Sequence, residues 1–373
     1  MLRDRKPKSR EKNMPERVYN FYAGPATLPY DVIKEAAKGV VNFDDLGMSV
    51  MEISHRSKQF DAMFCETQKN MLKIMGLSED EYIVLFLGGG ASTQFCAIPF
   101  NFLKEGMTAD YVVTGGWSKK AVKEARFFGN VNIAASSEDK NFSYIPKEFG
   151  LTPGAAYVHT TSNNTLVGTQ IKNFPDTGDV PLVSDMSSDF LSRKLDFGRF
   201  SLIYAGAQKN IGPSGVAAVV VKRSWVDQAR EEVPTMLAYR THLGKNSLFN
   251  TPPSFPVYVV GLVMRWILEQ GGLDAVEAAN DRKAALLYDY MDDNADFYRG
   301  TAEKDSRSLM NVTFRLPSEE LEKKFIAEGA ENDLVGLKGH RSVGGCRASI
   351  YNAMPYEGVE ALVEFMKGFR LKN

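Results

Sequence analysis

The chain has 373 residues, of which 44% are hydrophobic and 24% are charged, a composition typical of a folded globular protein large enough for two lobes. A formal net charge of −1 gives no overall field that would favour nucleic acid, and no apolar stretch is long enough to cross a membrane. The three cysteines lack metal-ligand spacing, so we expect a reduced, cytoplasmic protein that binds no metal.

Residues 1–17 are rich in lysine and arginine, and we expect them to form a disordered basic extension. The segments 29–43 and 60–75 then show the apolar spacing of amphipathic helices. The loop between these helices contains His55 and Arg56 side by side. Such a pair can hold an anion, because the guanidinium offers a planar fork of donors, but a solvent-exposed pair is the commoner outcome for these two residues alone.

A buried strand is predicted over 82–87, and three glycines lead from it into a helical pattern over 95–103. Ala91 and Ser92 stand at the helix start. This arrangement receives a phosphate group well, because free backbone N–H groups and the helix dipole face the anion. The spacing matches neither the Walker motif nor the dinucleotide fingerprint, so a single phosphate fits better than a nucleotide. A tight turn without a ligand fits the same residues.

Three further predicted strands end in residues that can contact a ligand. They cover 111–114, 156–161 and 181–188. Trp117 follows the first strand, Thr165 follows the second, and Asp185 lies in the third. The repeated strand–helix order predicts a mostly parallel sheet with helices on both faces. Ligands bind at the carboxyl ends of such strands, so these residues are expected to lie close together.

The apolar run 202–206 ends abruptly before Gln208 and Lys209, and a Gly-Pro-Ser-Gly turn leads into the apolar run 216–221. We interpret this stretch as strand, loop, strand, with Lys209 held at a strand end. A lysine that forms an imine with a carbonyl cofactor needs a rigid setting, because its amine must meet one carbon atom at a fixed distance. Taken alone, the stretch is more typical of an ordinary loop lysine.

The pattern changes after Trp225. Helices are predicted over 257–270 and 273–291, and the remaining chain alternates between short strands and helices. We therefore predict a large domain over 18–262 and a smaller α+β domain over 263–373.

The residues at the strand ends offer one partner to each feature of pyridoxal phosphate, which has an aldehyde, a phosphate, a flat ring and a ring nitrogen. Lys209 would form the imine, and Ala91 with Ser92 would take the phosphate. Trp117 would cover the ring, and Asp185 would pair with the protonated ring nitrogen. A cofactor-free protein that binds phosphate through its glycine loop is the alternative from a different functional class.

Eight blocks of sequence carry a resemblance to a known family. They are Asn20–Ala26, Ser54–Ser57, Gly88–Ser92, Thr114–Ser118, Ser184–Ser188, Ala205–Pro213, Asn250–Pro253 and Gly339–Ala353. In this order they resemble the phosphoserine aminotransferases, which are class V aminotransferases and fold-type-I pyridoxal-phosphate enzymes. The resemblance implies an α/β fold with a mainly parallel, seven-stranded sheet flanked by helices in the large domain, and a smaller α+β C-terminal domain.

The resemblance also implies a role for each site residue. Lys209, Asp185 and Trp117 would be catalytic. The cofactor would be held further by Ala91, Ser92, Thr165 and Gln208 and, from the second subunit of a homodimer, by Asn250 and Thr251. Arg347 would bind the substrate α-carboxylate. The distal anion would lie among His55, Arg56, His340 and Arg341, with the last two reaching across the dimer interface.

The implied reaction exchanges an amino group between L-glutamate and 3-phosphohydroxypyruvate, giving O-phospho-L-serine and 2-oxoglutarate, as in serine biosynthesis. Members of this family also act on 3-hydroxy-2-oxo-4-phosphooxybutanoate, on the route to pyridoxine. The alternatives with the same fold are an aminotransferase for serine, alanine or glyoxylate and a desulfurase. The two His-Arg pairs favour phosphorylated substrates, because the alternative substrates carry no distal phosphate.

Two positions depart from the family pattern. The segment that ends in Thr165 is looser than usual, because an acid often precedes this threonine in the family. Cys346 stands where other residues are common, and we interpret it as incidental because it lies in a Gly-Gly-Cys-Arg turn rather than on a mobile loop.

Overall fold

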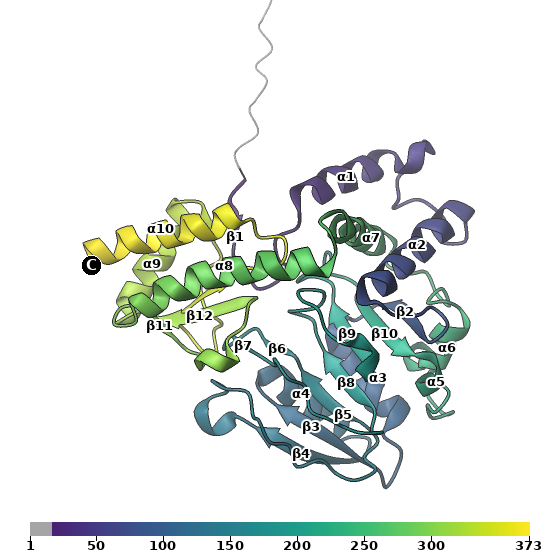
Figure 1. Ribbon diagram of the computed structural model, residues 1–373. Coiled ribbons are helices and arrows are strands. Elements are labelled where there is room, and N and C mark those ends of the chain that lie inside the picture. Colours follow the sequence, from purple (N-terminus) through teal and green to yellow (C-terminus); the bar gives the residue numbers. More distant parts are fainter. Residues whose placement is uncertain (1–16) are drawn as a thin grey trace, which may run out of the picture.

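The computed structural model describes residues 17–373, and these residues form two parts that lie side by side (Figure 1). The larger part surrounds a seven-stranded sheet, and the smaller part contains the C-terminal helix. Residues 1–16, which make up nearly all of the predicted basic extension, lie outside the described residues. The next residue, Arg17, donates hydrogen bonds to the Thr27 hydroxyl at 3.1 Å and to the Leu28 carbonyl at 2.8 Å.

The large sheet is mainly parallel, as the sequence predicts. Its strands, in spatial order, are β2 (Tyr82–Leu87), β10 (Ala217–Lys222), β9 (Phe200–Gly206), β8 (Leu182–Asp185), β5 (Val158–Thr161), β3 (Thr108–Val113) and β4 (Asn130–Ser136). Strand β10 runs antiparallel to both of its neighbours, and the other pairs are parallel. Strands β2, β10 and β9 are nearly continuous apolar runs, which is the pattern of strands covered on both faces.

Helices cover both faces of this sheet. On one face lie α1 (Tyr30–Val41), α2 (Lys58–Met75) and α7 (Ser254–Glu269), and on the other lie α3 (Gly90–Phe102) and α4 (Gly116–Ala125). Successive strand residues point to opposite faces. Val84 and Phe86 of β2 therefore join the first hydrophobic core, whereas Ile83 and Leu85 join the second.

The connecting segments contain short elements that the sequence pattern did not reveal. They are β6 (Asn163–Asn164), β7 (Thr169–Gln170), α5 (Arg223–Val226) and α6 (Tyr239–Gly244), with 3-10 turns at Phe43–Asp45, Glu138–Lys140, Phe197–Arg199, Thr235–Leu237 and Lys304–Ser306. The pairing of β6 with β7 makes Asn163 and Asn164 a short strand, and Thr165 begins the turn that connects it to β7.

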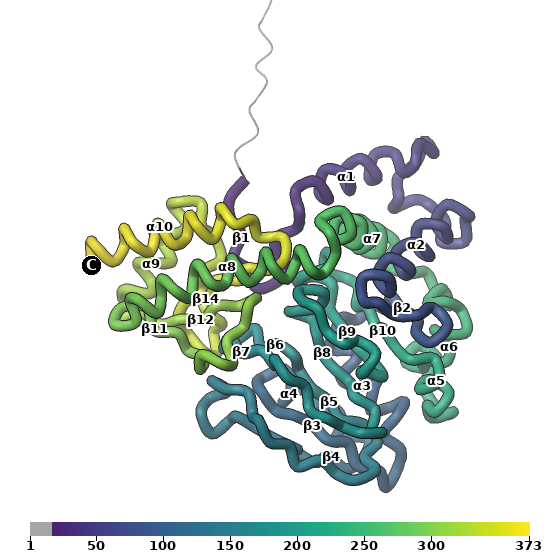
Figure 2. Tube along the Cα trace, in the orientation of Figure 1, coloured from purple at the N-terminus to yellow at the C-terminus, as the bar shows by residue number. Residues whose placement is uncertain are grey.

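The smaller part has its own sheet and core. Strands β11 (Arg299–Gly300), β12 (Asn311–Arg315) and β14 (Cys346–Ser349) pair antiparallel, and α8 (Leu273–Asp293), α9 (Glu319–Glu331) and α10 (Tyr356–Lys372) pack beside them. The N-terminal strand β1 (Tyr19–Asn20) pairs with β13 (Leu334–Val335), so the purple beginning of the described chain lies against its C-terminal part (Figure 2). Phe21 is completely buried in this C-terminal core. The predicted domain boundary at 262/263 falls inside α7.

Buried polar groups join the two parts. The Asn163 amide donates to Oδ1 of Asn311 at 2.8 Å, and the Asn352 N–H donates to Oδ1 of Asn210 at 3.0 Å. Hydrogen-bonded polar groups that are buried fix one relative position, because each lost bond would leave an unsatisfied group.

Lys283 of α8 anchors the segment that follows β14. It is 2% exposed, and its Nζ lies within hydrogen-bond distance of four backbone carbonyl oxygens. These belong to Ile350, Tyr351, Asn352 and Met354, at 3.1, 2.7, 3.4 and 3.1 Å. The lysine therefore fixes the turn through which Asn352 reaches Asn210.

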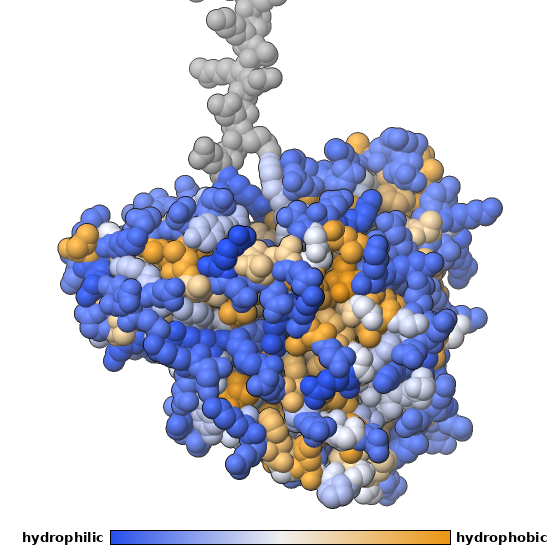
Figure 3. Space-filling view, viewed as in Figure 1, coloured by the Kyte–Doolittle hydropathy of each residue, from blue (hydrophilic) through white to orange (hydrophobic). Residues whose placement is uncertain are grey.

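The surface is mainly hydrophilic on the face shown in Figure 3, with hydrophobic residues gathered in a central band. Exposed apolar side chains also occur between α1 and α2, at Met48 and Met51, and before α7, at Phe249. Among the described residues, none of the helices has the length and hydrophobicity needed to cross a membrane. The same residues contain no group of three or more metal-ligating side chains placed around one point.

Candidate active site

The predicted site residues of the large domain meet at one edge of its sheet. Asp185 ends β8, and Lys209 follows the end of β9. Thr165 follows β6, Trp117 lies just after β3, and Ser92 lies in the first turn of the helix that follows β2. Strands β2, β3, β8 and β9 run in one direction, so their carboxyl ends meet at the same edge of the sheet, and a hydrogen bond to Lys209 places Thr165 there as well.

Hydrogen bonds fix the backbone around Lys209. The N–H of Ala207 donates to the Val216 carbonyl at 3.0 Å, which closes the base of the β9–β10 loop. The neighbouring Asn210 amide donates to the Ser188 carbonyl at 3.0 Å. The Lys209 Nζ itself donates to Oγ1 of Thr165 at 3.0 Å. The amine is therefore held at a defined point instead of extending into solvent.

Burial lowers the pKa of the Lys209 amine below its usual value. The Asp185 carboxylate opposes this shift, and the positive charge of Arg347 supports it. A lowered lysine pKa increases the neutral fraction of the amine, which is the form that acts as nucleophile and base.

Asp185 is 5% exposed, and only one of its oxygens is satisfied by the protein. Oδ1 accepts hydrogen bonds from the Ser187 N–H at 2.9 Å and from the Ser187 hydroxyl at 2.6 Å. Within residues 17–373 no donor reaches Oδ2, so this oxygen can accept a hydrogen bond from a ligand. Burial raises the pKa of Asp185, while the Lys209 charge and the Ser187 hydrogen bonds lower it.

Trp117 lies in the first turn of α4. The Lys209 Nζ lies 5.8 Å from the centroid of the indole ring, and the Lys120 Nζ lies 4.1 Å from it. The indole Nε1 is buried and has no hydrogen-bond partner in the described part of the chain. The ring is therefore a flat apolar surface beside the Lys209 amine.

The start of α3 has the features of an anion site. Gly89 and Gly90 have φ values of 85° and 63°, which glycine adopts without strain. No described side chain caps this helix, and its first turn, which includes Ala91 and Ser92, contains no acidic residue. The first N–H groups of a helix lack intrahelical partners, and the helix dipole makes this end positive. An anion such as a phosphate is therefore favoured here.

Arg347 connects the small domain to the lysine site. It lies in β14, and its Nη1 donates to the Thr165 carbonyl at 3.1 Å. Thr165 thus contacts Lys209 through its hydroxyl and Arg347 through its backbone. The Arg347 Nε is buried without a partner among residues 17–373, so it can donate to a bound group. Gln208 is part-buried, and its carbonyl accepts from the Ala26 N–H at 2.9 Å.

A second group of positive charges lies close to Arg347 in the same chain. His340 is part-buried, and its Nδ1 lies 2.7 Å from the Ser342 hydroxyl. Burial lowers the pKa of His340, and the charges of Arg347, Arg341 and Lys120 add to this shift. These four basic residues therefore share one region, which suits a substrate that carries two anionic groups.

The remaining predicted residues lie on other segments. His55 and Arg56 precede α2, and neither side chain makes a hydrogen bond or ion pair with residues 17–373. Figure 1 shows the α1–α2 connection at the outer edge of the molecule, away from the smaller part that carries Arg347. Asn250 and Thr251 are exposed. Asn250 lines a cavity of about 300 Å³ together with Gly88 and Gly89.

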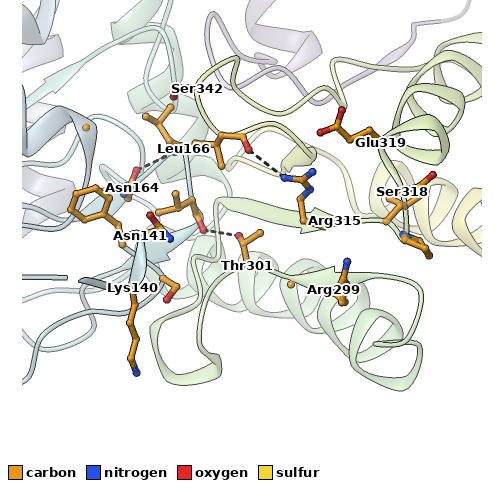
Figure 4. Close-up of a pocket in the computed structure, with 18 of the residues that line it drawn as sticks. Lys140, Asn141, Asn164, Leu166, Arg299, Thr301, Arg315, Ser318, Glu319 and Ser342 are labelled. Atoms are coloured by element: carbon orange, nitrogen blue, oxygen red, sulfur yellow. Dashed lines mark hydrogen bonds between the residues drawn. The ribbon is translucent and has the colours of Figure 1, made fainter. Parts of the chain in front are cut away.

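A larger cavity of about 1230 Å³ lies beside this site, between the two parts of the chain (Figure 4). None of the predicted site residues lines it, although Asn164 and Ser342 are direct neighbours of Thr165 and Arg341. Carboxylates already neutralise most of its positive side chains. Lys119 pairs with Glu138, Lys140 with Glu303 and Arg315 with Glu322, at 2.5, 3.2 and 2.5 Å. The larger cavity therefore offers few unpaired positive charges to an anionic ligand.

The sequence reasoning missed two residues that contact the site. Ser187 holds Asp185 in a turn that an Asp-x-Ser spacing predicts, because aspartate side chains accept from the N–H two residues on. Lys120 lies over Trp117 because residues three apart on a helix share one face. Cys346 begins β14 and is buried, and burial raises the pKa of its thiol well above the usual value, so it is not a reactive cysteine.

The groups around Lys209 fit pyridoxal phosphate. The amine suits the aldehyde, Asp185 Oδ2 is free for the ring nitrogen, Trp117 offers a flat surface, and the start of α3 is open to the phosphate. Each of these groups has an unused bonding capacity that the cofactor would satisfy.

Comparisons with known proteins agree with this chemistry. The aminotransferase class-V family matches residues 18–362. The phosphoserine aminotransferase of Desulfosudis oleivorans is 58% identical over 362 residues, which are 96% of this chain and 100% of that protein. The structure of the phosphoserine aminotransferase from Bacillus circulans subsp. alkalophilus matches with a TM-score of 0.94 at 55% identity, over 96% of this chain and 100% of that one.

A further structure, a phosphoserine aminotransferase from Trichomonas vaginalis with bound pyridoxal phosphate, matches with a TM-score of 0.89 at 37% identity, over 94% of this chain and 100% of that one. The likeness covers the sheet, the smaller domain and the edge where the site residues meet. Pyridoxal phosphate is accordingly the cofactor, and the chain belongs to the class-V aminotransferases and, within them, to the phosphoserine aminotransferases.

Proposed function

We propose that this protein transfers an amino group reversibly between L-glutamate and 3-phosphohydroxypyruvate, giving O-phospho-L-serine and 2-oxoglutarate. The observation that carries the proposal is the position of the Lys209 amine beside Trp117 and Thr165, with Arg347 bound to the same threonine. Because Thr165 binds both groups, the Lys209 amine and the Arg347 guanidinium lie close together. The amine can then act at the α-carbon of an amino acid while the guanidinium binds its carboxylate.

When bound, pyridoxal phosphate accepts the amino group and withdraws electrons from the substrate α-carbon. Lys209 would move the proton at that carbon, since its lowered pKa favours the neutral amine. Asp185 Oδ2 would hold the proton of the ring nitrogen, and Trp117 would cover the ring. Ala91, Ser92 and Gln208 would hold the cofactor from the large domain, and the Thr165 hydroxyl would position it beside Lys209.

Arg347 would bind the α-carboxylate through a planar pair of donors, which fixes the reacting carbon near Lys209. The distal group is a γ-carboxylate in glutamate and a phosphate in the other substrate. His340 and Arg341 stand near Arg347 and can bind either anion, because both are acceptors with negative charge. His55 and Arg56 would complete this distal site.

We further propose that the protein acts as a homodimer in the cytoplasm. The support is the exposed apolar side chains of Met48, Met51 and Phe249, which stand close in sequence to His55, Arg56 and Asn250. A second copy that covers this surface would bring Asn250 and Thr251 to the partner's phosphate site. The position of the α1–α2 connection favours His55 and Arg56 as residues supplied in the same way, and the crossing of His340 and Arg341 stays a prediction.

A mixing experiment can decide which residues cross the interface. Lys209→Ala, expected to be inactive, and Arg56→Ala, expected to bind the distal anion weakly, are unfolded together and refolded, and activity is measured at a substrate concentration well below the KM of Arg56→Ala. Recovered activity is expected if Lys209 and Arg56 of one site come from different subunits, because one site in the mixed dimer is then intact. The same test with Arg341→Ala in place of Arg56→Ala asks whether His340 and Arg341 reach the site of the partner subunit. No recovery with either variant would contradict a shared site.

The function is tested by following glutamate formation from O-phospho-L-serine and 2-oxoglutarate, with L-serine and L-alanine as comparison donors. We expect a strong preference for phosphoserine, because only this donor has a phosphate for the distal site. Preference for serine or alanine would move the function to a neighbouring class-V aminotransferase. Glutamate consumption with 3-hydroxy-2-oxo-4-phosphooxybutanoate as the acceptor tests the second activity. Lys209→Ala is the control, expected to fold but not to turn over.

A further inference from the structure

Ser187 contacts the Asp185 carboxylate in two ways. Both residues are buried, at 6% and 5% exposure. The Ser187 hydroxyl lies 2.6 Å from Asp185 Oδ1, and the Ser187 N–H donates to the same oxygen at 2.9 Å. The carboxylate is thus turned so that its other oxygen, Oδ2, faces away from the serine.

The direction of the Ser187 hydroxyl proton follows from a third contact. The N–H of Gly206 donates to the Ser187 Oγ at 3.0 Å, so this oxygen acts there as an acceptor. Its own hydrogen is then available for Asp185 Oδ1, which carries no hydrogen when the carboxylate is ionised. Gly206 is the last residue of β9, three positions before Lys209. The serine therefore connects Asp185 to the strand that carries the lysine.

The protonation states of Asp185 and Lys209 are coupled by their charges. Burial disfavours the ionised carboxylate, and the Lys209 ammonium and the Ser187 donors favour it. The nearby Asp189 charge also disfavours it. An amine that accepts a proton from a substrate must be neutral beforehand, so Lys209 cannot supply its charge at that moment. The two hydrogen bonds from Ser187 do not depend on the charge of Lys209.

We propose that Ser187 is a positioning residue that keeps Asp185 ionised and directs its Oδ2 toward the ring nitrogen of the cofactor, whichever charge Lys209 carries. This inference rests on the proposed function, in which Asp185 pairs with that nitrogen. It assigns to Ser187 no contact with substrate or cofactor.

The experiment compares two cofactors in wild type and in Ser187→Ala. One is pyridoxal phosphate, and the other is its deaza analogue, in which a C–H group replaces the ring nitrogen. Dissociation constants are measured by absorbance titration of cofactor-free protein. Ser187→Ala is expected to weaken pyridoxal phosphate by about tenfold, the size of one hydrogen bond to a charged group, and to leave the analogue unchanged. A loss of general structure would weaken both cofactors.

The matched control is Ser184→Ala. Ser184 is buried at the same strand end, and its hydroxyl accepts from the Thr160 hydroxyl at 3.0 Å and makes no hydrogen bond to the Asp185 carboxylate. The Ser184→Ala variant is expected to bind both cofactors as the wild type does. The proposal is wrong if Ser187→Ala binds both cofactors like the wild type, or if it weakens both equally. A wild type that binds the two cofactors equally would instead refute the pairing of Asp185 with the ring nitrogen.

Discussion

The glycines before α3 allow a graded test of the phosphate site. Gly88 has no protein atom within 4 Å of the position that a Cβ would take, and its φ is not positive. Gly90 also has free space but has a φ of 63°. Gly89 has a φ of 85°, and a Cβ there would lie 1.9 Å from the Thr93 hydroxyl oxygen and 2.8 Å from the Thr93 Cβ. Alanine therefore adds neither strain nor a clash at Gly88. It adds backbone strain at Gly90, and both backbone strain and a clash with Thr93 at Gly89.

The magnitudes follow from these differences. A residue with a Cβ loses about 1 kcal/mol or somewhat more in the left-handed region. Forcing a side chain against packed neighbours costs about 1–3 kcal/mol more. We therefore expect Gly88→Ala to change the free energy of unfolding of the cofactor-free protein by less than about 0.5 kcal/mol. Gly90→Ala should lose about 1 kcal/mol, and Gly89→Ala about 2–4 kcal/mol.

Denaturant unfolding of the three cofactor-free variants gives these differences, and absorbance titration then gives their affinity for pyridoxal phosphate. Gly89→Ala should also bind the cofactor more weakly than Gly90→Ala, because displacement of Thr93 distorts the turn whose N–H groups face the phosphate. Equal stability of Gly89→Ala and Gly88→Ala would refute the reasoning, since only strain and contact distinguish the two positions.

Other perturbations test the remaining contacts. Lys283→Met should lower the free energy of unfolding by about 2 kcal/mol or more, because four buried carbonyls lose their donor, and denaturant titration measures this loss. Arg307 lowers the pKa of Asp292 to about 2, so the folded state gains stability from this carboxylate above about pH 4 and loses it as the pH falls toward 2. Asp292→Asn should therefore be less stable than wild type by about 1 kcal/mol at pH 6, a figure reduced for solvent screening, with a smaller gap at pH 3. The exposed Asp293→Asn is the control and should show no such gap. Arg341→Ala should raise the KM for O-phospho-L-serine about tenfold or more without changing the affinity for the cofactor. If substrate and cofactor binding weakened equally, Arg341 would not belong to the distal-anion site.

Strong local patterns made much of the fold predictable. The continuous apolar runs of β2, β9 and β10 can only be strands covered on both faces, and the repeated strand–helix order gave the mainly parallel sheet. The start of α4 at Gly116 is hard to foresee, because Gly115 and Gly116 are typical of a loop, whereas Ser118 accepts from two N–H groups at this helix start. A two-residue strand such as β1 has no periodicity, so its pairing with β13 could not be foreseen.

The candidate site was predictable at positions where the chemistry needs one particular residue type, as it needs a lysine for the imine and an acid for the ring nitrogen. Lys209 and Asp185 stand at strand ends with the required spacing, so their neighbourhood followed from topology. The contact of Thr165 with both Lys209 and Arg347 could not be foreseen, since it depends on the packing of two domains. The same holds for the hydrogen bond from Gly206 to Ser187, which depends on strand register and a rotamer.

The pairing of β1 with β13 sets the order in which the molecule can be completed. Residues 19–21 cannot meet their partners until residues 334–335 and 349 have left the ribosome, because Phe21 accepts from the Ser349 N–H and β1 pairs with β13. The Ala26 N–H, a few residues further on, donates to the carbonyl of Gln208 next to Lys209. Residues 19–26 are thus synthesised early but make these contacts late. When they pack in place, the Ala26 N–H completes the hydrogen bonds of the backbone next to Lys209. A chain that ends before Ser349 would therefore lack the contacts that seat this segment beside Lys209.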